Sequence, residues 1–149
     1  MFSTLLKQLL RCKAVKGEVV AVDSRAVKAY SQRDLKNKRG KSDREARVGR
    51  GRRGFILGYK VHTACCTSSE LPLAVKVAPC NVNEKLCFKP LLKKLKGRGI
   101  GFKTVLADAQ YDSAKVREIV REYGAEPVIP YRKSSKIKRA LKVGRDFVI

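Results

Sequence analysis

Two aspartates in this 149-residue chain, Asp23 and Asp108, each stand at the end of a short apolar run. A carboxylate in that position is unfavourable without a partner, and two neighbouring carboxylates repel each other unless a cation joins them. Hard divalent ions accept carboxylate oxygen, and two such ions stabilise the attacking and leaving oxygens of a phosphoryl displacement. We therefore predict that Asp23 and Asp108 are catalytic residues that bind Mg²⁺ or Mn²⁺.

The alternative is that such aspartates serve only local structure, as a helix cap or a turn residue. We favour this alternative for Asp112, because it lies next to Ser113 at the expected start of a helix. For Asp23 and Asp108 we favour the metal site, because each of them ends an apolar run.

The elements that position the two aspartates are predicted from hydrophobic periodicity and turn signals. Strands are expected at residues 18–25, 55–66, 71–78, 102–108 and 127–130. Helices are expected at residues 83–96 and 113–124. A helix between two strands indicates a crossover to a parallel neighbour. The predicted fold class is therefore α/β, a mixed five-stranded sheet of order 3-2-1-4-5 flanked by helices, in which the strands of Asp23 and Asp108 are adjacent.

Three details of these elements are also expectations. The strand at 18–25 is apolar on both faces, which is typical of a central strand covered on both sides. Pro90 indicates that the helix at 83–96 is regular only in its later part, or kinked. Residues 2–12 follow helical spacing, which favours a short amphipathic helix that packs on the domain over one that lies on a membrane surface.

The charge of the chain indicates a polyanionic partner. The formal net charge is +22, from 35 Lys and Arg against 13 Asp and Glu, and nucleic acid is the usual partner of such a protein. A basic ribosomal or chromatin-type protein fits the charge alone equally well. No apolar run approaches the roughly 20 residues of a membrane span, and no signal peptide is recognised, so no membrane partner is expected.

Residues 31–54 contain many cationic side chains, several glycines and almost no apolar residues. No core can form there, so a long loop or disordered insert is expected, and loops of this length are usually functional. Its charges would neutralise several phosphates with a steep salt dependence, although a merely solvated loop is the alternative. The predicted DNA-binding residues are Arg33, Lys36, Lys38, Arg39, Lys41, Arg44, Arg47, Arg50, Arg52 and Arg53.

The cysteines and the single histidine give no metal site by spacing. An odd number of cysteines without a CxxC pair indicates neither zinc nor a closed disulfide framework. We expect small buried apolar side chains in a reducing cytoplasm, with one disulfide as the alternative. His62 is expected to be packed or hydrogen-bonded rather than a ligand. The cysteines are Cys12, Cys65, Cys66, Cys80 and Cys87.

Taken in order, five segments resemble the DDE-type insertion-sequence transposases over about residues 18–135. They are residues 20–24 (VAVDS), 58–62 (GYKVH), 71–73 (LPL) with Asn81, 105–113 (VLADAQYDS) and 127–132 (PVIPYR). The resemblance implies a ribonuclease-H-like fold and Mg²⁺-dependent strand cleavage and strand transfer at transposon ends, with transposon-end and target DNA as partners. Asp23 and Asp108 match the first two acids of the family's triad. Lys60 and His62 fall on a matching strand, but no role follows for either of them.

Two departures from the family pattern give further expectations. The family's third acid is a Glu on a helix beyond the last strand, whereas no Glu follows Glu126 here and Asp146 is the only later acid. Family members usually carry an N-terminal DNA-binding segment, and only about 17 residues precede the first strand here. The chain is therefore expected to be an incomplete fragment, inactive alone unless a homodimer partner or a complementing chain supplies the third acid. A non-catalytic basic nucleic-acid-binding protein is the alternative.

The expected domain organisation has three parts. Residues 1–16 form an N-terminal amphipathic helix, and residues 17–135 form a partial ribonuclease-H-like catalytic domain that carries the basic insert 31–54. Residues 136–149 are a truncated C-terminal basic segment.

Overall fold

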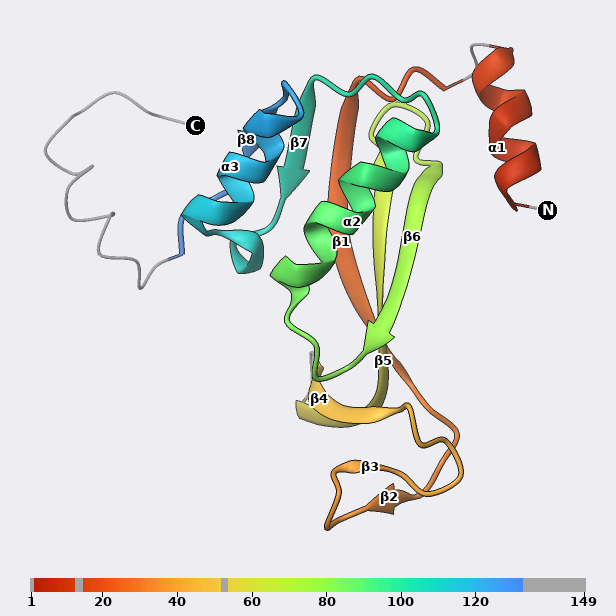
Figure 1. Ribbon diagram of the computed structural model, residues 1–149, viewed down its shortest axis with the longest axis vertical. Coiled ribbons are helices and arrows are strands. Elements are labelled where there is room, and N and C mark those ends of the chain that lie inside the picture. Colours follow the sequence, from red (N-terminus) through yellow and green to blue (C-terminus); the bar gives the residue numbers. More distant parts are fainter. Residues whose placement is uncertain (1, 13–14, 52–53, 133–149) are drawn as a thin grey trace, which may run out of the picture.

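The computed structural model describes residues 2–12, 15–51 and 54–132 (Figure 1). The helices are α1 (Phe2–Arg11), α2 (Glu84–Gly97) and α3 (Ala114–Glu122), with a 3-10 turn η1 (Ala109–Tyr111). The strands are β1 (Val19–Lys28), β2 (Arg33–Asp34), β3 (Arg39–Gly40), β4 (Arg47–Gly51), β5 (Gly54–Cys66), β6 (Pro72–Pro79), β7 (Thr104–Ala107) and β8 (Glu126–Val128). The C-terminal segment 136–149 predicted above, with Asp146, lies outside the described residues.

The central strand of the sheet is β1. It pairs antiparallel with β5 on one side and parallel with β7 on the other. β5 pairs antiparallel with β6, and β7 pairs parallel with β8, so these five strands follow one another as β6-β5-β1-β7-β8. The parallel β1–β7 pair is joined through α2, as a crossover requires. The predicted α/β class, with a mixed sheet flanked by helices, is confirmed.

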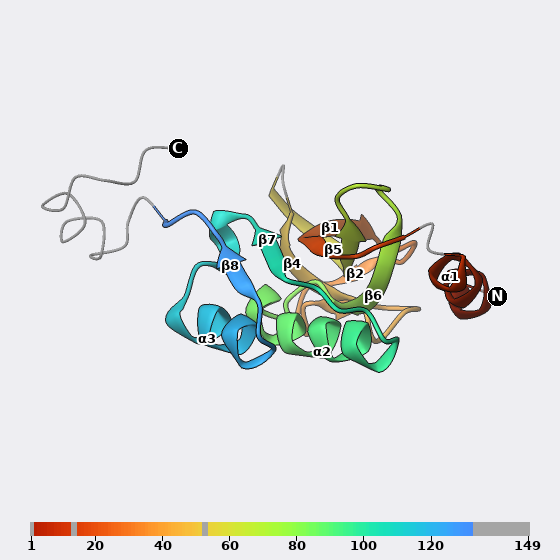
Figure 2. The same ribbon diagram turned by 90° about the horizontal axis from the view of Figure 1, so that it is seen from above.

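The core lies between this sheet and the helices α2 and α3, which cover the same face (Figure 2). Val20 and Val22 of β1 point toward the helices and are buried. Val19 and Ala21 alternate with them on the other face and are only partly buried. The expectation that β1 is covered on both sides is therefore wrong for the described residues, because α2 and α3 share one face.

Helix α2 supplies the largest apolar surface to this core. Its apolar residues recur at the spacing of one helix face, and Phe88, Leu91, Leu92 and Leu95 are fully buried. The helix spans Glu84–Gly97, close to the expected residues 83–96, so the expectation that only its later part is regular is wrong. The alternative of a kink at Pro90 stays a prediction. The N-cap explains the regular start, because the side chain of Asn83 accepts the N–H of Lys85 at 3.0 Å.

Helix α1 lies beside the β6 edge of the sheet (Figure 2) and buries Leu6. This agrees with an amphipathic helix that packs on the domain. Among the residues that the structure describes, no helix combines the length and apolar character that a membrane span requires.

Residues 31–51, called the basic lobe from here on, form short strands rather than the expected loop or disordered insert. β2, β3 and β4 pair antiparallel in succession, and β4 extends the edge of β5. Asp34 and Asp43 each accept backbone N–H groups of their own turns. The Tyr59 hydroxyl donates to Asp43 at 2.7 Å, and Ala46 is fully buried. The expectation failed because polar side chains satisfy this backbone without an apolar core.

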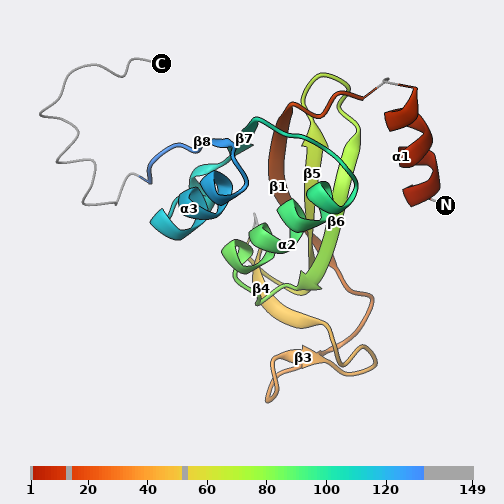
Figure 3. The same cartoon turned by 45° about the horizontal axis from the view of Figure 1, so that its top comes forward.

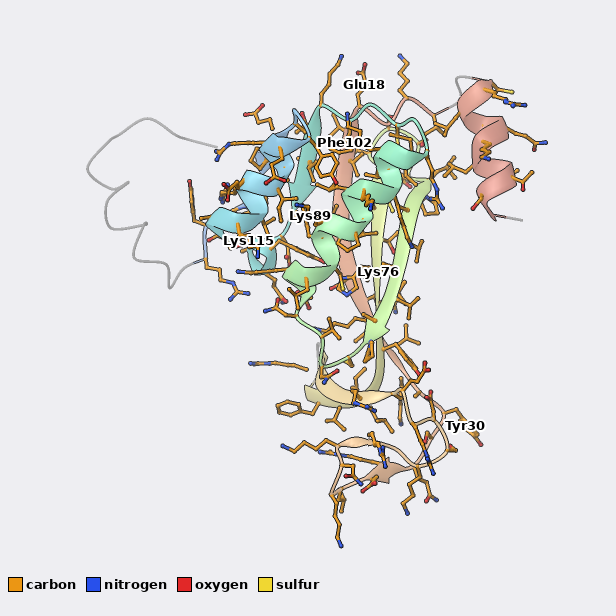
Figure 4. The ribbon with its side chains drawn as sticks, viewed as in Figure 1. Glu18, Tyr30, Lys76, Lys89, Phe102 and Lys115 are labelled. Carbon is orange, nitrogen blue, oxygen red and sulfur yellow. The ribbon has the colours of Figure 1, made fainter. Side chains whose placement is uncertain are left out.

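The basic lobe projects from the end of the sheet at which β1 and β7 finish (Figures 1 and 3). Figure 4 shows Tyr30, at the exit from β1, pointing into solvent, whereas Phe102 lies among the core elements. Polar hydrogen bonds hold the lobe, whereas apolar packing holds the body of the domain.

The five cysteines are all free thiols. Cys66, Cys80 and Cys87 are buried as expected, whereas Cys12 is exposed and Cys65 is partly buried. The expectation of five buried side chains is wrong for these two. Cys12 follows the last residue of α1, and Cys65 lies on the sheet face that α2 and α3 leave open, because neighbours on a strand point to opposite faces.

Candidate active site

Asp23 and Asp108 come to adjacent positions at one end of the sheet. β1 and β7 run parallel in a register that pairs Val22 with Ala107. Asp23 follows Val22 within β1, and Asp108 is the first residue after β7. Neighbouring strands lie about 4.8 Å apart, so the two backbones are side by side at this point. The strand pairing that brings these residues together is the β1–β7 crossover.

Both aspartate side chains are exposed. Oδ1 of Asp23 accepts the N–H of Ser24 at 2.7 Å. Oδ1 of Asp108 accepts the N–H of Gln110 at 2.9 Å, so this carboxylate caps the turn η1. Capping was the alternative role considered for such an aspartate, and it leaves Oδ2 of Asp108 without an assigned contact in the described residues.

Tyr111 lies beneath the two carboxylates and connects their surroundings. Its side chain is buried against Phe88, with ring centroids 5.4 Å apart. Burial raises the pKa of Tyr111, a hydrogen bond with Ser24 opposes the rise, and the charges of Asp23 and Asp108 add to it. The charges of both aspartates therefore act on the pKa of one buried phenol.

His62 is fully buried and lies 3.4 Å from the same phenol, measured from Nδ1 to the Tyr111 oxygen. Among the described residues Nε2 has no hydrogen-bond partner. Burial lowers the pKa of His62, the charge of Glu84 opposes this, and Lys60 and Lys76 add to it. The packed position agrees with the structural role favoured for this histidine.

Asp112 joins three cationic residues below the site. Its carboxylate accepts from the Arg117 guanidinium at 3.0 Å and from the Arg132 N–H at 2.9 Å. Its carbonyl accepts from Nζ of Lys85 at 2.6 Å. Burial raises the pKa of Asp112, but the Arg132 N–H and the Arg117 guanidinium outweigh it and hold the pKa below its usual value. The cap of α3 is Ser113, so Asp112 is a structural residue of a different kind from the one expected.

Lys60 is one half of a partly buried ion pair with Glu84, with Nζ and Oε1 2.6 Å apart. This contact fixes the start of α2 against β5. No role was predicted for Lys60, and Glu84 was not singled out, although it directly follows Asn83, the N-cap of α2.

The predicted DNA-binding residues lie almost entirely on the basic lobe. Arg39 and Arg47 are partly buried. Arg52 and Arg53 lie outside the described residues. The other members of the set are exposed, and they are Arg33, Lys36, Lys38, Lys41, Arg44 and Arg50.

The donor set at the sheet end fits a hard divalent cation in part. Two exposed carboxylates supply the oxygen donors that Mg²⁺ and Mn²⁺ prefer, and waters complete such shells. Within residues 2–12, 15–51 and 54–132, no group of three or more His, Cys, Asp or Glu side chains gathers at one point. The described residues therefore supply at most two carboxylates, Asp23 and Asp108, at this end of the sheet.

A mixed sheet flanked by helices, with acids at the ends of two adjacent parallel strands, defines a ribonuclease-H-like domain. The model of the family described as transposase DDE domain matches residues 15–147. The chain belongs to this family. No curated protein matches the chain.

Two solved structures are similar to the chain at low identity. One is a cryo-EM structure of the piggyBac transposase synaptic complex with hairpin DNA, at 12% identity and a TM-score of 0.49, which covers 90% of this chain and 27% of that one. The other is the Mos1 transposase paired-end complex with the left transposon end, at 12% identity and a TM-score of 0.47, which covers 95% of this chain and 51% of that one. This chain thus spans about a quarter and about half of those two chains.

Proposed function

We propose that this chain acts in DNA transposition, as the catalytic part of a transposase that cleaves and transfers DNA strands. The observation that carries the proposal is the adjacent position of Asp23 and Asp108 at the ends of parallel strands. Membership of the transposase DDE domain family and the net charge of +22 support it. DNA is the polyanion that this combination favours.

Asp23 and Asp108 would hold a divalent ion, Mg²⁺ or Mn²⁺, between them. When bound, such an ion lowers the energy of the charge that develops on phosphoryl oxygens. The chain's own residues keep the two carboxylates in register: the β1–β7 pairing sets their spacing, and the η1 turn holds one oxygen of Asp108 through the N–H of Gln110. Tyr111 is buried close enough for the charges of both aspartates to act on it.

We further propose that a second chain supplies a third acid to these two. Two carboxylates bind a divalent ion more weakly than three, so the chain alone is expected to have low activity. Either a homodimer partner or a complementing chain would meet this need.

The experiment is a nicking assay on supercoiled plasmid with 5 mM Mn²⁺ or Mg²⁺, about the level at which weak divalent sites fill. Any metal-dependent cleavage is expected to disappear in Asp23→Asn and Asp108→Asn and to persist in the lobe control Asp34→Asn. Cleavage unchanged in both site variants would remove the metal-site assignment. Robust cleavage and strand transfer by the chain alone would remove the claim that a third acid is missing.

A further inference from the structure

A cavity of about 450 Å³ lies beside the aspartate pair, between the basic lobe, the start of α2 and the turn after β7. In Figure 1 the start of α2 lies between β4 and the turn after β7. Its lining combines four cations with Glu84 as the only acid among the described residues there. The cations are Arg50, Lys60, Lys85 and Arg132.

Gln110 connects the cavity to Asp108, which does not itself line the cavity. Gln110 lines it and donates its backbone N–H to Oδ1 of Asp108. A group bound in the cavity would therefore lie within one turn of backbone of a proposed catalytic carboxylate.

Two of the cations are held in place by neutral partners. Nζ of Lys85 donates to the Asp112 carbonyl at 2.6 Å. Arg132 donates from its guanidinium to the carbonyls of Ala109 at 2.9 Å and Gln110 at 3.1 Å. A carbonyl orders a cationic head without cancelling its charge, so the electrostatic attraction for an anion remains. Lys60 differs, because Glu84 neutralises it.

The wall that carries Arg50 is fixed by close packing of β4 on the segment before α2. A Cβ atom at Gly49 would lie 2.0 Å from the carbonyl oxygen of Cys80 and 2.9 Å from the backbone nitrogen of Asn81. Only glycine allows this approach, which sets Arg50 at the mouth of the cavity. The lobe and the segment before α2 are thus in contact at this point.

We propose that this cavity is a binding site for one backbone phosphate of a DNA strand, seated next to the aspartate pair. Guanidinium and ammonium groups that converge from three elements match a phosphate, and the volume has room for the attached sugar. The inference rests on the proposed function, which identifies the ligand as a DNA strand. It adds the residues that position this DNA strand relative to the aspartate pair. Lys85 and Arg132 are the principal ligands, and Arg50 is the contribution of the lobe.

The test measures DNA binding without divalent metal, so that catalysis plays no part. Fluorescence anisotropy of a labelled 20-bp duplex is followed in EDTA from 50 to 200 mM KCl, the range over which counterion release separates affinities. Lys85→Gln and Arg132→Gln are compared with Lys93→Gln and Arg121→Gln, which remove the same charges from exposed positions on α2 and α3. Lys85→Arg serves as the conservative variant, and urea unfolding checks that each variant is folded.

Each cavity substitution is expected to weaken binding about tenfold and to reduce the salt slope by about 1, with Lys85→Arg close to the unsubstituted chain. The two control substitutions are expected to change the affinity less than about twofold. Gly49→Ala should also weaken binding, because it displaces Arg50 while retaining every charge. Equal losses in cavity and control variants would overturn the proposal.

A second arm separates a strand phosphate from a free anion. Inorganic phosphate is titrated while the backbone amides of Lys85 and Gln110 are followed by NMR. If phosphate shifts these amides but cavity substitutions leave the duplex affinity unchanged, the cavity binds free anion and the proposal is wrong. Because DNA binding is measured in EDTA, a failure of metal-dependent cleavage would leave this inference intact.

Discussion

The body of the domain and the basic lobe are ordered by opposite means. In the body, Phe88, Leu91 and Val120 are fully buried between α2, α3 and the sheet. In the lobe, Ala46 is the only fully buried apolar side chain among the described residues, and turn carboxylates satisfy the backbone instead. Apolar burial gives the body its stability, whereas the lobe exposes many charged side chains and buries little apolar surface.

Because of this difference, the geometry of the aspartate pair and the affinity for DNA should depend on different parts of the chain. The aspartate pair lies on strands of the body, so its geometry depends on apolar packing. Most of the predicted DNA-binding cations lie on the lobe, so DNA affinity should respond to changes that leave the body intact.

Phe88→Ala is expected to destabilise the whole domain by about 4 kcal/mol, because the ring is fully buried against Tyr111. Urea unfolding followed by circular dichroism measures the change. Leu86→Ala, on the exposed side of α2, is the matched control and should change stability by less than about 0.5 kcal/mol. A similar small effect in both variants would contradict the account of the core.

Asp112→Asn should destabilise the domain by about 3 kcal/mol, because it leaves the buried Arg117 guanidinium without its counter-charge. The folded-state pKa of Asp112 is below its ordinary value, so its contribution is present above about pH 4 and is lost as the pH falls through the folded pKa. The urea midpoint measured from pH 7 to pH 3 should fall less steeply in Asp112→Asn. Parallel curves for the two proteins would show that this carboxylate has no such role.

His62 gives a second pH dependence with a different window. Its pKa is lowered in the folded state, so the unfolded chain binds more protons just below pH 6.5 and stability falls there as the pH falls. One such group changes the unfolding free energy by at most about 1.4 kcal/mol per pH unit. In His62→Gln the slope between pH 6.5 and 5 should be smaller. An unchanged slope would mean that another group titrates in this range.

Tyr59→Phe should affect the lobe alone. The hydroxyl of Tyr59 donates to Asp43 at 2.7 and 2.8 Å, and this hydrogen bond holds the pKa of Tyr59 at about 12. Removing it is expected to reduce hydrogen-exchange protection severalfold in β3 and β4 without changing the urea midpoint. A loss of global stability would show that lobe and body form one cooperative unit.

Much of the body could be predicted from its sequence, because its apolar periodicity is strong. The strands around Asp23 and Asp108 and the helix with its stripe at Phe88, Leu91 and Leu95 are where the pattern indicated. The bounds of α2 also agree with the expected residues 83–96. The expectation that only its later part is regular failed, because the cap at Asn83 outweighs one missing N–H within the helix.

The lobe and the surroundings of the acids could not be predicted in the same way. The strands of the lobe depend on hydrogen bonds of Asp34 and Asp43, which have no periodic signature. The cavity residues Lys85 and Arg132 come together only through tertiary contacts with the η1 turn. The order of the two acids along adjacent strands was predictable from the crossover, but their hydrogen bonds were not.

The central claim is that Asp23 and Asp108 form one site for a divalent ion, and Mn²⁺ titration calorimetry tests it most directly. The unsubstituted chain is expected to bind Mn²⁺ weakly, and the binding heat should disappear in both Asp23→Asn and Asp108→Asn while it persists in Asp34→Asn. Mn²⁺ binding that is unchanged in both site variants would contradict the claim.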